Sequence, residues 1–214
     1  GAYVASVGTG AGVVRYWDAR TGVDVWPPKA LVAMAITTGV SYDGAVVGAV
    51  TYPGGVWLWD ARSGSEIGPP LGDGAVDFAF SPTAPLVAVP SGGSIEIWSI
   101  ARPPERVALI PFGSSLASTS NGKYLAVKSG ARSVDLWDME TYKRVPRPSF
   151  GGYLGAVHAF DPGDSFVLAG DGEYWDFHSG LPMGRPIAEY EGYHDRTAFD
   201  PVASRVAVKS GRDG

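Results

Sequence analysis

Short apolar runs alternate with Gly-rich and polar turns along the whole chain, a pattern typical of many short β-strands. One kind of run ends in Trp, as in Val13–Trp17, which alternates as a strand does. A second apolar run lies before it, and a Gly-rich connection suited to a tight hairpin joins the two. These second runs are Tyr3–Val7, Ala45–Val50, Leu86–Val89, Tyr124–Val127, Phe166–Ala169 and Arg205–Val208. The pattern therefore predicts a series of antiparallel hairpins.

The Trp strands recur at an even spacing. Their Trp residues occupy positions 17, 59, 98, 137 and 175, in steps of 42, 39, 39 and 38 residues. A third apolar strand lies further upstream in the repeat and ends in a turn, as in Phe78–Pro82. After the Trp come a turn and a Pro-containing segment such as Ile67–Leu71, which fits an edge strand because Pro breaks no ladder hydrogen bond there. Four short antiparallel strands in about 40 residues describe a β-propeller blade.

Composition agrees with an all-β fold and excludes several kinds of function. The 30 Gly and 17 Pro among 214 residues disfavour helices, and 45 % hydrophobic residues are enough for a core. Because Cys is absent, we expect no disulfide framework and no thiolate metal site. A net charge of −5 indicates neither a nucleic-acid nor a membrane partner, and the apolar runs are too short to cross a bilayer. The N-terminal residues show no signal peptide, so we expect a cytoplasmic protein.

The Trp-Asp dipeptides at Trp17, Trp59, Trp137 and Trp175, together with Phe78–Pro82 and Ile67–Leu71, resemble WD40 repeats, particularly those of bacterial proteins. The resemblance covers nearly the whole chain and implies an all-β propeller of four-stranded antiparallel blades. In that family a His, an Asp, a Ser or Thr and the Trp form a structural hydrogen-bonded tetrad. Most of that pattern is absent here. His194 lies near the expected His position, Asp171 lies near the turn position, and Asp73 takes a His-like place.

The repeat predicts how the 214 residues are divided. Written as an outer strand followed by three inner strands, four complete blades span residues 23–61, 64–100, 105–139 and 143–178, and residues 1–22 and 181–214 form partial blades. Either the chain is a segment of a larger propeller, for example a seven-bladed one, or its two ends complete one blade of a closed five-bladed ring. Closure would leave Tyr3–Val7 as a duplicate strand, so we favour the segment. An open array would self-associate through unpaired strand edges.

Two groups of residues that could hold a cofactor or a metal have simpler interpretations. Gly8–Gly12 resembles a dinucleotide loop, but a strand follows it where a helix is needed, so we interpret it as a hairpin turn. His158, His178 and His194 are 20 and 16 residues apart, unlike the short pairs of zinc sites. We therefore expect no cofactor and no metal, and we interpret His194 as a structural hydrogen-bonding group.

The acidic groups and the basic cluster are likewise interpreted as structural. Asp161–Asp164 lacks the alternating ligands of a calcium loop, which leaves an Asx-rich turn. The pairs Asp171/Glu173 and Glu189/Glu191 show no shared cleft that would make them a general acid and base. The basic cluster Lys143–Arg147 indicates a solvated outer strand more than a phosphate contact.

The resemblance implies a non-catalytic scaffold or sensor that binds a protein or peptide, as part of a larger bacterial signalling or regulatory protein. Tyr190, Tyr193 and His194 form an aromatic and polar patch that we predict as the partner-binding surface. Four arginines in or beside the Trp strands and their turns are assigned to no site: Arg15, Arg20, Arg62 and Arg132.

Two alternative functions stay open. One is a propeller enzyme, hydrolase-like or lactonase-like, with metal ligands in a central channel, which stoichiometric bound metal would support. The other is a purely structural array without a specific partner.

Overall fold

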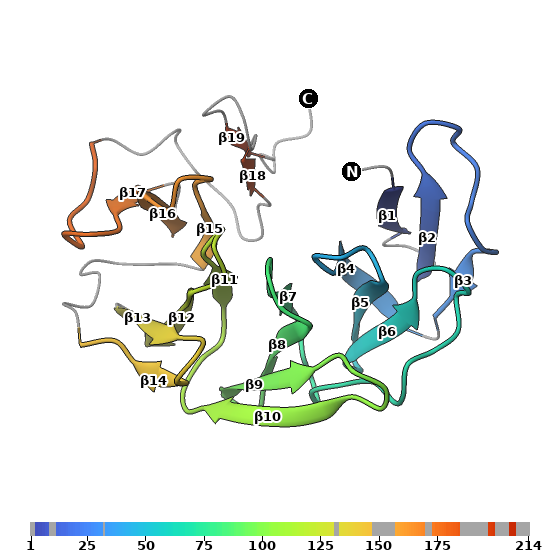
Figure 1. Cartoon of the computed structure of the whole chain (residues 1–214), viewed down its shortest axis with the longest axis horizontal. Coiled ribbons are helices and arrows are strands. Elements are labelled where there is room, and N and C mark those ends of the chain that lie inside the picture. The colour runs from blue at the N-terminus through green and yellow to red at the C-terminus, as the bar shows by residue number, and fades with distance from the viewer. Residues whose placement is uncertain are drawn as a thin grey trace. The chain divides into compact units, whose positions relative to one another are not determined.

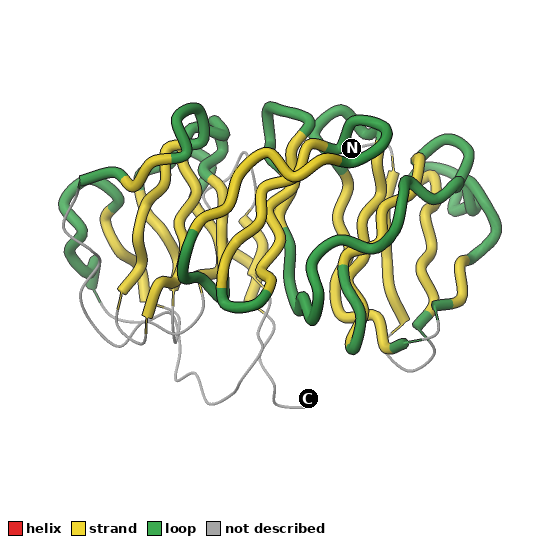
Figure 2. Tube along the Cα trace, turned by 90° about the horizontal axis from the view of Figure 1, so that it is seen from below, coloured by secondary structure: helices red, strands yellow, loops and turns green. Residues whose placement is uncertain are grey.

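A computed structural model describes residues 3–8, 12–31, 33–130, 133–146, 157–169, 173–184, 197–199 and 206–208. Every regular secondary-structure element in these ranges is a β-strand, and the strands form six antiparallel sheets (Figures 1 and 2). The predicted all-β fold is therefore confirmed. The chain divides into two compact units, residues 1–111 and 112–214.

The first unit contains three sheets. In the first sheet the strand order is β1-β2-β3, in the second β4-β5-β6, and in the third β10-β9-β8-β7. The strands are β1 (Tyr3–Gly8), β2 (Val13–Asp18), β3 (Lys29–Ala30), β4 (Met34–Val40), β5 (Val46–Tyr52), β6 (Val56–Asp60), β7 (Ala79–Phe80), β8 (Leu86–Ser91), β9 (Ser94–Ser99) and β10 (Glu105–Ile110).

The second unit contains the other three sheets, in the orders β11-β12-β13-β14, β15-β16-β17 and β18-β19. The strands are β11 (Leu116–Ser118), β12 (Tyr124–Gly130), β13 (Ser133–Asp138), β14 (Lys143–Arg144), β15 (Val157–Phe160), β16 (Phe166–Ala169), β17 (Glu173–Asp176), β18 (Thr197–Phe199) and β19 (Val206–Val208).

The predicted hairpins are confirmed in five sheets. Each repeated Trp lies on the second strand of a hairpin, opposite an apolar residue of the first. In chain order, the residues opposite the five Trp are Val4, Val47, Val87, Leu125 and Val167. The Trp strands therefore have the same register throughout the repeat.

In the five sheets that contain a repeated Trp, the segment that pairs with the outer edge of the Trp strand follows that strand in the sequence. β10 pairs with β9, and β14 pairs with β13, while single bridges join Trp59 to Glu66 and Val56 to Leu71. The third sheet thus spans residues 79–110, whereas the predicted segments 64–100 and 105–139 each began with an outer strand. The physical reason is the tight turn after each Trp, which returns the chain antiparallel to the strand it has just left.

Apolar residues pack between neighbouring sheets of the first unit. Trp59 and Val47 of the second sheet pack with Val14, Tyr16 and Trp26 of the first sheet. On the other side, the second and third sheets share a larger cluster: Val46, Val50, Val56, Leu58, Ile67, Leu71, Ala75, Phe78, Val87, Val89 and Ile100. Burial of each large side chain contributes about 1.5–3 kcal/mol, so the sheets stabilise one another through these contacts.

The second unit has one equivalent core between its first two sheets. Phe160, Val167, Trp175 and Phe177 pack against residues of β11, β12 and β13. The rings of Phe160 and Phe177 meet edge to face, with centroids 5.3 Å apart. An edge-to-face pair of aromatic rings adds stability beyond the buried area alone.

We predict that Gly48→Ala destabilises the first unit. A Cβ at position 48 would lie 2.8 Å from Cε2 of Phe78, in a tightly packed contact between two sheets. Overpacking of this kind costs about 1–3 kcal/mol. Urea unfolding measures the loss. Gly8→Ala is the control, because its Cβ would have only an ordinary contact, 4.0 Å from the Val13 oxygen. Equal stability of the two variants would contradict the packing described.

Candidate functional site

Two kinds of turn lie at the same end of a sheet that contains both, because consecutive strands are antiparallel. One turn joins the first two strands, and the other follows the Trp strand. Backbone hydrogen bonds tie the two turns together, from Ala61 N–H to the Ala45 oxygen and from Ile100 N–H to the Pro85 oxygen. We call the turns of the first unit at this end the turn surface. It comprises residues 18–22, 41–46, 60–65, 81–86 and 99–104.

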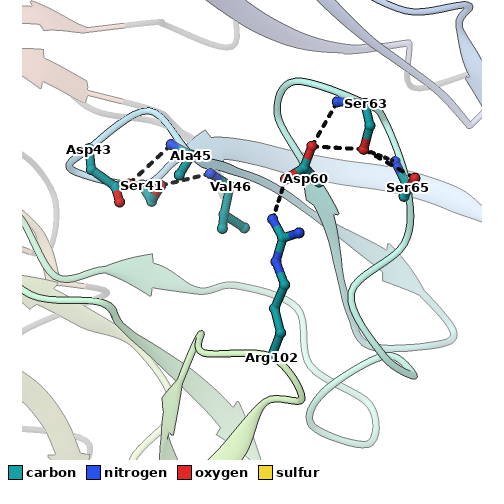
Figure 3. A network of polar contacts seen from close by, with 8 residues as sticks. All are labelled: Ser41, Asp43, Ala45, Val46, Asp60, Ser63, Ser65 and Arg102. Atoms are coloured by element: carbon teal, nitrogen blue, oxygen red, sulfur yellow. Dashed lines mark hydrogen bonds and ion pairs between the residues drawn. The ribbon is translucent and has the colours of Figure 1, made fainter.

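The turn after the Trp strand is closed by the Asp that follows the Trp. In the second sheet, Asp60 Oδ1 accepts the backbone N–H and the hydroxyl of Ser63, both at 2.7 Å (Figure 3). The Gly64 N–H donates to the Asp60 carbonyl oxygen at 2.8 Å. Asp18, Asp138 and Asp176 make the corresponding contacts in three other sheets. A single carboxylate therefore satisfies the donors of each turn.

These donors stabilise the ionised carboxylates. The backbone N–H of Thr21 lowers the pKa of Asp18, and the N–H of Thr141 lowers the pKa of Asp138. The N–H of Ser179 does the same to the pKa of Asp176. A hydrogen bond to the charged form of an acid favours that form, so the turns are closed best when these groups are deprotonated.

Arg102 joins two of the turns. Its guanidinium, from the turn after β9, forms an ion pair with Asp60 in the turn after β6 (Figure 3). The Arg102 side chain is 56 % exposed and the Asp60 side chain 18 %. The guanidinium holds the pKa of Asp60 well below its usual range, and the Ser63 donors lower it further. The contact fixes the third sheet's turn beside the second sheet's turn.

The turn between the first two strands has its own hydrogen bonds. The Ser41 hydroxyl donates to Asp43 Oδ1 at 2.7 Å and accepts the Val46 N–H at 2.9 Å (Figure 3). Asp43 Oδ1 also accepts the Ala45 N–H, and the Ser41 hydroxyl lowers the pKa of this carboxyl. Thr119 and Asn121 form the same arrangement in the second unit. These turns are held by side chains as well as by the backbone.

The turn surface exposes three arginines and one tyrosine, beside Asp43 and several Ser, Thr and Pro residues. Arg20 and Arg62 are exposed, and neither forms an ion pair with any residue in the described part of the chain. Tyr42 is 49 % exposed and lies between Ser41 and Asp43. Since the Asp18 and Asp60 carboxylates are occupied by turn donors, Arg20 and Arg62 keep guanidinium donors that face solvent. Arg20, Tyr42, Arg62 and Arg102 are the candidate site.

Sequence reasoning did not assign this site. It noted Arg20 and Arg62 but assigned them to no function. The pattern that could have found them is Trp-Asp-Ala-Arg, which occurs at residues 17–20 and 59–62. This pattern does not identify Arg102, because Arg102 is the fourth residue after Trp98, whereas Arg20 and Arg62 are the third residue after their Trp.

The second unit uses an acid for a different contact between sheets. Asp164 accepts the Ser120 N–H at 2.6 Å and the Ser120 hydroxyl at 2.9 Å. Within the same turn, Asp161 accepts the N–H groups of Ser165 and Phe166 at 2.6 and 2.7 Å. The predicted Asx-rich turn at residues 161–164 is therefore confirmed, and its second Asp joins the two neighbouring sheets.

Oppositely charged residues also pair across the outer edges of three sheets. Arg15 on β2 binds Asp24 at 2.6 Å, and Arg106 on β10 binds Glu96 at 2.9 Å. Arg144 on β14 binds Asp135 at 2.6 Å, so this part of the basic cluster belongs to an exposed outer strand, as predicted. Exposed pairs of this kind contribute at most about 1 kcal/mol each.

Several predicted residues lie outside the described part of the chain. They are the three residues of the predicted partner-binding patch, Tyr190, Tyr193 and His194, together with Asp171, Arg132, Glu189 and Glu191. For His158 only the backbone, on β15, is described. The prediction of a partner-binding patch at residues 190–194 therefore stays a prediction.

Other predicted residues lie where the repeat placed them. His178 is exposed in the turn after Trp175, and its N–H donates to Asp176 at 3.0 Å. Gly12 N–H donates to the Gly8 oxygen at 3.1 Å, and the strands on either side, β1 and β2, pair as an antiparallel hairpin, as predicted. Asp73 is exposed.

The Trp hydrogen bond of the WD40 tetrad is not formed at three of the Trp positions. Within the described residues, the buried indole N–H groups of Trp17, Trp59 and Trp137 have no partner. Trp98 instead donates its indole N–H to Glu96 Oε2 on its own strand, at 2.9 Å. The residues opposite the Trp on the neighbouring strand are apolar.

Comparison with known proteins identified no relative of this chain. The chain matches no model of a protein family, and no curated protein matches it. No described helix is long and apolar enough to span a membrane. Among the described residues, no three His, Cys, Asp or Glu side chains are grouped so as to hold a metal ion.

We predict that Trp98→Phe costs more stability than Trp137→Phe. Both Trp are half-buried at the same register position, but only Trp98 donates a hydrogen bond to a carboxylate. Phe at 98 loses that bond, whereas Phe at 137 removes a buried donor that has no partner. We expect a difference of about 1–2 kcal/mol in the free energy of unfolding, measured in urea. A Trp137→Phe variant that is as destabilised as Trp98→Phe would contradict the assignment.

We predict that Asp138→Asn weakens the protein at neutral pH but not in acid. A carboxyl whose pKa is lowered by folding stabilises the fold above its ordinary pKa of about 3.9. That contribution is lost as the pH falls through the folded-state pKa. The stability difference between wild type and variant, followed from pH 7 to pH 2.5, should therefore shrink toward acid. Asp73→Asn, at an exposed position, is the control and should differ little from wild type at any pH.

Proposed function

We propose that this chain is a WD40-like propeller segment that serves as a non-catalytic interaction module and binds a protein partner through the turn surface. Support for the fold comes from five Trp strands with one register, each in an antiparallel sheet of three or four strands. A scaffold or sensor within a larger bacterial signalling or regulatory protein is the role that the resemblance to WD40 repeats favours.

The observation that carries the proposal is the kind of side chain that the turn surface exposes. Arg20, Tyr42, Arg62 and Arg102 are all exposed on turns, next to carboxylates that are occupied by the turns themselves. Tyr and Arg are the residue types most enriched, with Trp, among the residues that dominate protein interfaces.

The turns are also suited to binding because they are held in one conformation. Each Asp after a Trp accepts backbone N–H groups, and backbone bonds join neighbouring turns of one sheet. A surface that is already ordered loses less conformational entropy when a partner binds. The same logic places binding residues of many proteins on loops that a rigid scaffold supports.

A site-specific crosslink tests this function. The chain has no Cys, so Tyr42→Cys gives a single point of attachment for a benzophenone group. After incubation in an extract of the native cells and illumination, we expect one reproducible protein adduct.

Tyr52→Cys is the matched control. Tyr52 is 54 % exposed and lies at the opposite end of β5 from Tyr42. A specific adduct at position 42 that is absent at position 52 supports the proposal. No adduct at 42, or the same adducts at both positions, would overturn it.

A further inference from the structure

We infer that the turn surface binds an acidic polypeptide segment. This inference rests on the proposed function and names the chemistry of the partner. It is carried by the placement of three arginines on adjoining turns and by the hydrogen bonds that already occupy the carboxylates beside them.

The arginines recur along three consecutive sheets. Arg20 and Arg62 are each the third residue after a Trp, and Arg102 is the fourth. All three side chains are exposed. A guanidinium carries up to five donors and no acceptor, and it binds carboxylates in a two-pronged geometry.

Contacts between the sheets keep these turns next to one another. Gly64, in the same turn as Arg62, packs on Trp26 of the first sheet. A Cβ at position 64 would lie 2.9 Å from Cγ of that Trp, and φ is +70° there. On the other side, Arg102 binds Asp60, two residues before Arg62. The turn bearing Arg62 is thus packed against both neighbouring sheets.

The nearby carboxylates form no ion pair with Arg20 or Arg62 among the described residues. Asp18 accepts the backbone N–H groups of Arg20 and Thr21, at 2.9 and 2.8 Å. Asp60 is occupied by Ser63 and Arg102. An incoming carboxylate therefore meets free guanidinium donors at positions 20 and 62.

Tyr42 adds an apolar ring and a hydroxyl to the surface, which suits a peptide better than a bare anion. Asp43, beside it, is an exposed carboxylate on the turn surface and opposes an acidic partner. The inference consequently predicts opposite effects for two neighbouring sites. Removal of the Arg charge weakens binding, and removal of the Asp43 charge strengthens it.

The second unit lacks these arginines. The third residue after the Trp is Glu140 in one of its sheets and His178 in another. Two exposed lysines of that unit, Lys123 and Lys143, serve as a charge-matched control for the arginines.

The test begins with a library of random 12-residue peptides displayed on phage and selected on the full chain. We expect the selected peptides to be enriched in Asp and Glu, and the enrichment to disappear when selection is repeated on Arg20→Gln/Arg62→Gln. Selected peptides without acidic enrichment would overturn the inference while leaving the interaction module in place. No selected peptide at all would overturn both proposals.

Titration of one selected acidic peptide into the wild-type chain and its variants then measures how much each side chain contributes to the affinity. We expect Arg20→Gln/Arg62→Gln to weaken binding about tenfold or more and Asp43→Asn to strengthen it about twofold to threefold, with both effects smaller in high salt. Lys123→Gln/Lys143→Gln removes the same charge and should change the affinity less than twofold. Equal losses in the two double variants would mean that net charge alone attracts the peptide, which would overturn the inference. A single-stranded DNA oligonucleotide that binds more tightly than the peptide would overturn it as well.

Discussion

The carboxylate that follows four of the five repeated Trp residues closes the turn on which the outer part of each sheet depends, and in the third sheet the Ser99 hydroxyl takes its place by accepting the Ala101 N–H. A strand that ends in the sequence Trp-Asp needs a tight turn before the chain can return along its outer edge. The first N–H groups of that turn have no strand partner, and an Asp side chain is a local acceptor for such turn donors. In four sheets the Asp side chain accepts these donors at 2.7 or 2.8 Å. The returning segment can then pair with the Trp strand and complete the sheet.

The same turns connect one sheet to the next. Asp60 accepts the donors of its own turn and also the guanidinium of Arg102 from the following sheet. Gly64 of this turn packs on Trp26 of the preceding sheet. The acids are used in this way, and Arg20 and Arg62 beside them stay exposed without an ion pair among the described residues. The same Asp side chains therefore close the turns and leave the guanidinium groups of Arg20 and Arg62 exposed to a partner.

The sequence predicted the hairpins well, for a definite reason. A Trp strand and the apolar run before it are local in sequence, and their alternation is visible in residues such as 13–17. The grouping of strands into sheets was predicted less well. An outer segment such as Ile67–Leu71 could pair with the Trp strand before it or begin the next unit, and the choice depends on hydrogen bonds that no residue pattern displays. The Arg102–Asp60 contact joins residues 42 positions apart and was likewise not visible. The candidate site was missed because it depends on which charges are already paired.

Amide hydrogen exchange at the turn after the Trp strand tests the central claim most directly. The N–H groups of Thr21, Ser63, Thr141 and Ser179 lie on exposed turns, where solvent would reach them if no carboxylate accepted them. If the Asp side chains close the turns, these four amides exchange well below the rate of an unstructured peptide at neutral pH. Exchange of all four amides at the unstructured rate would contradict this account of the turns and of the surface they support.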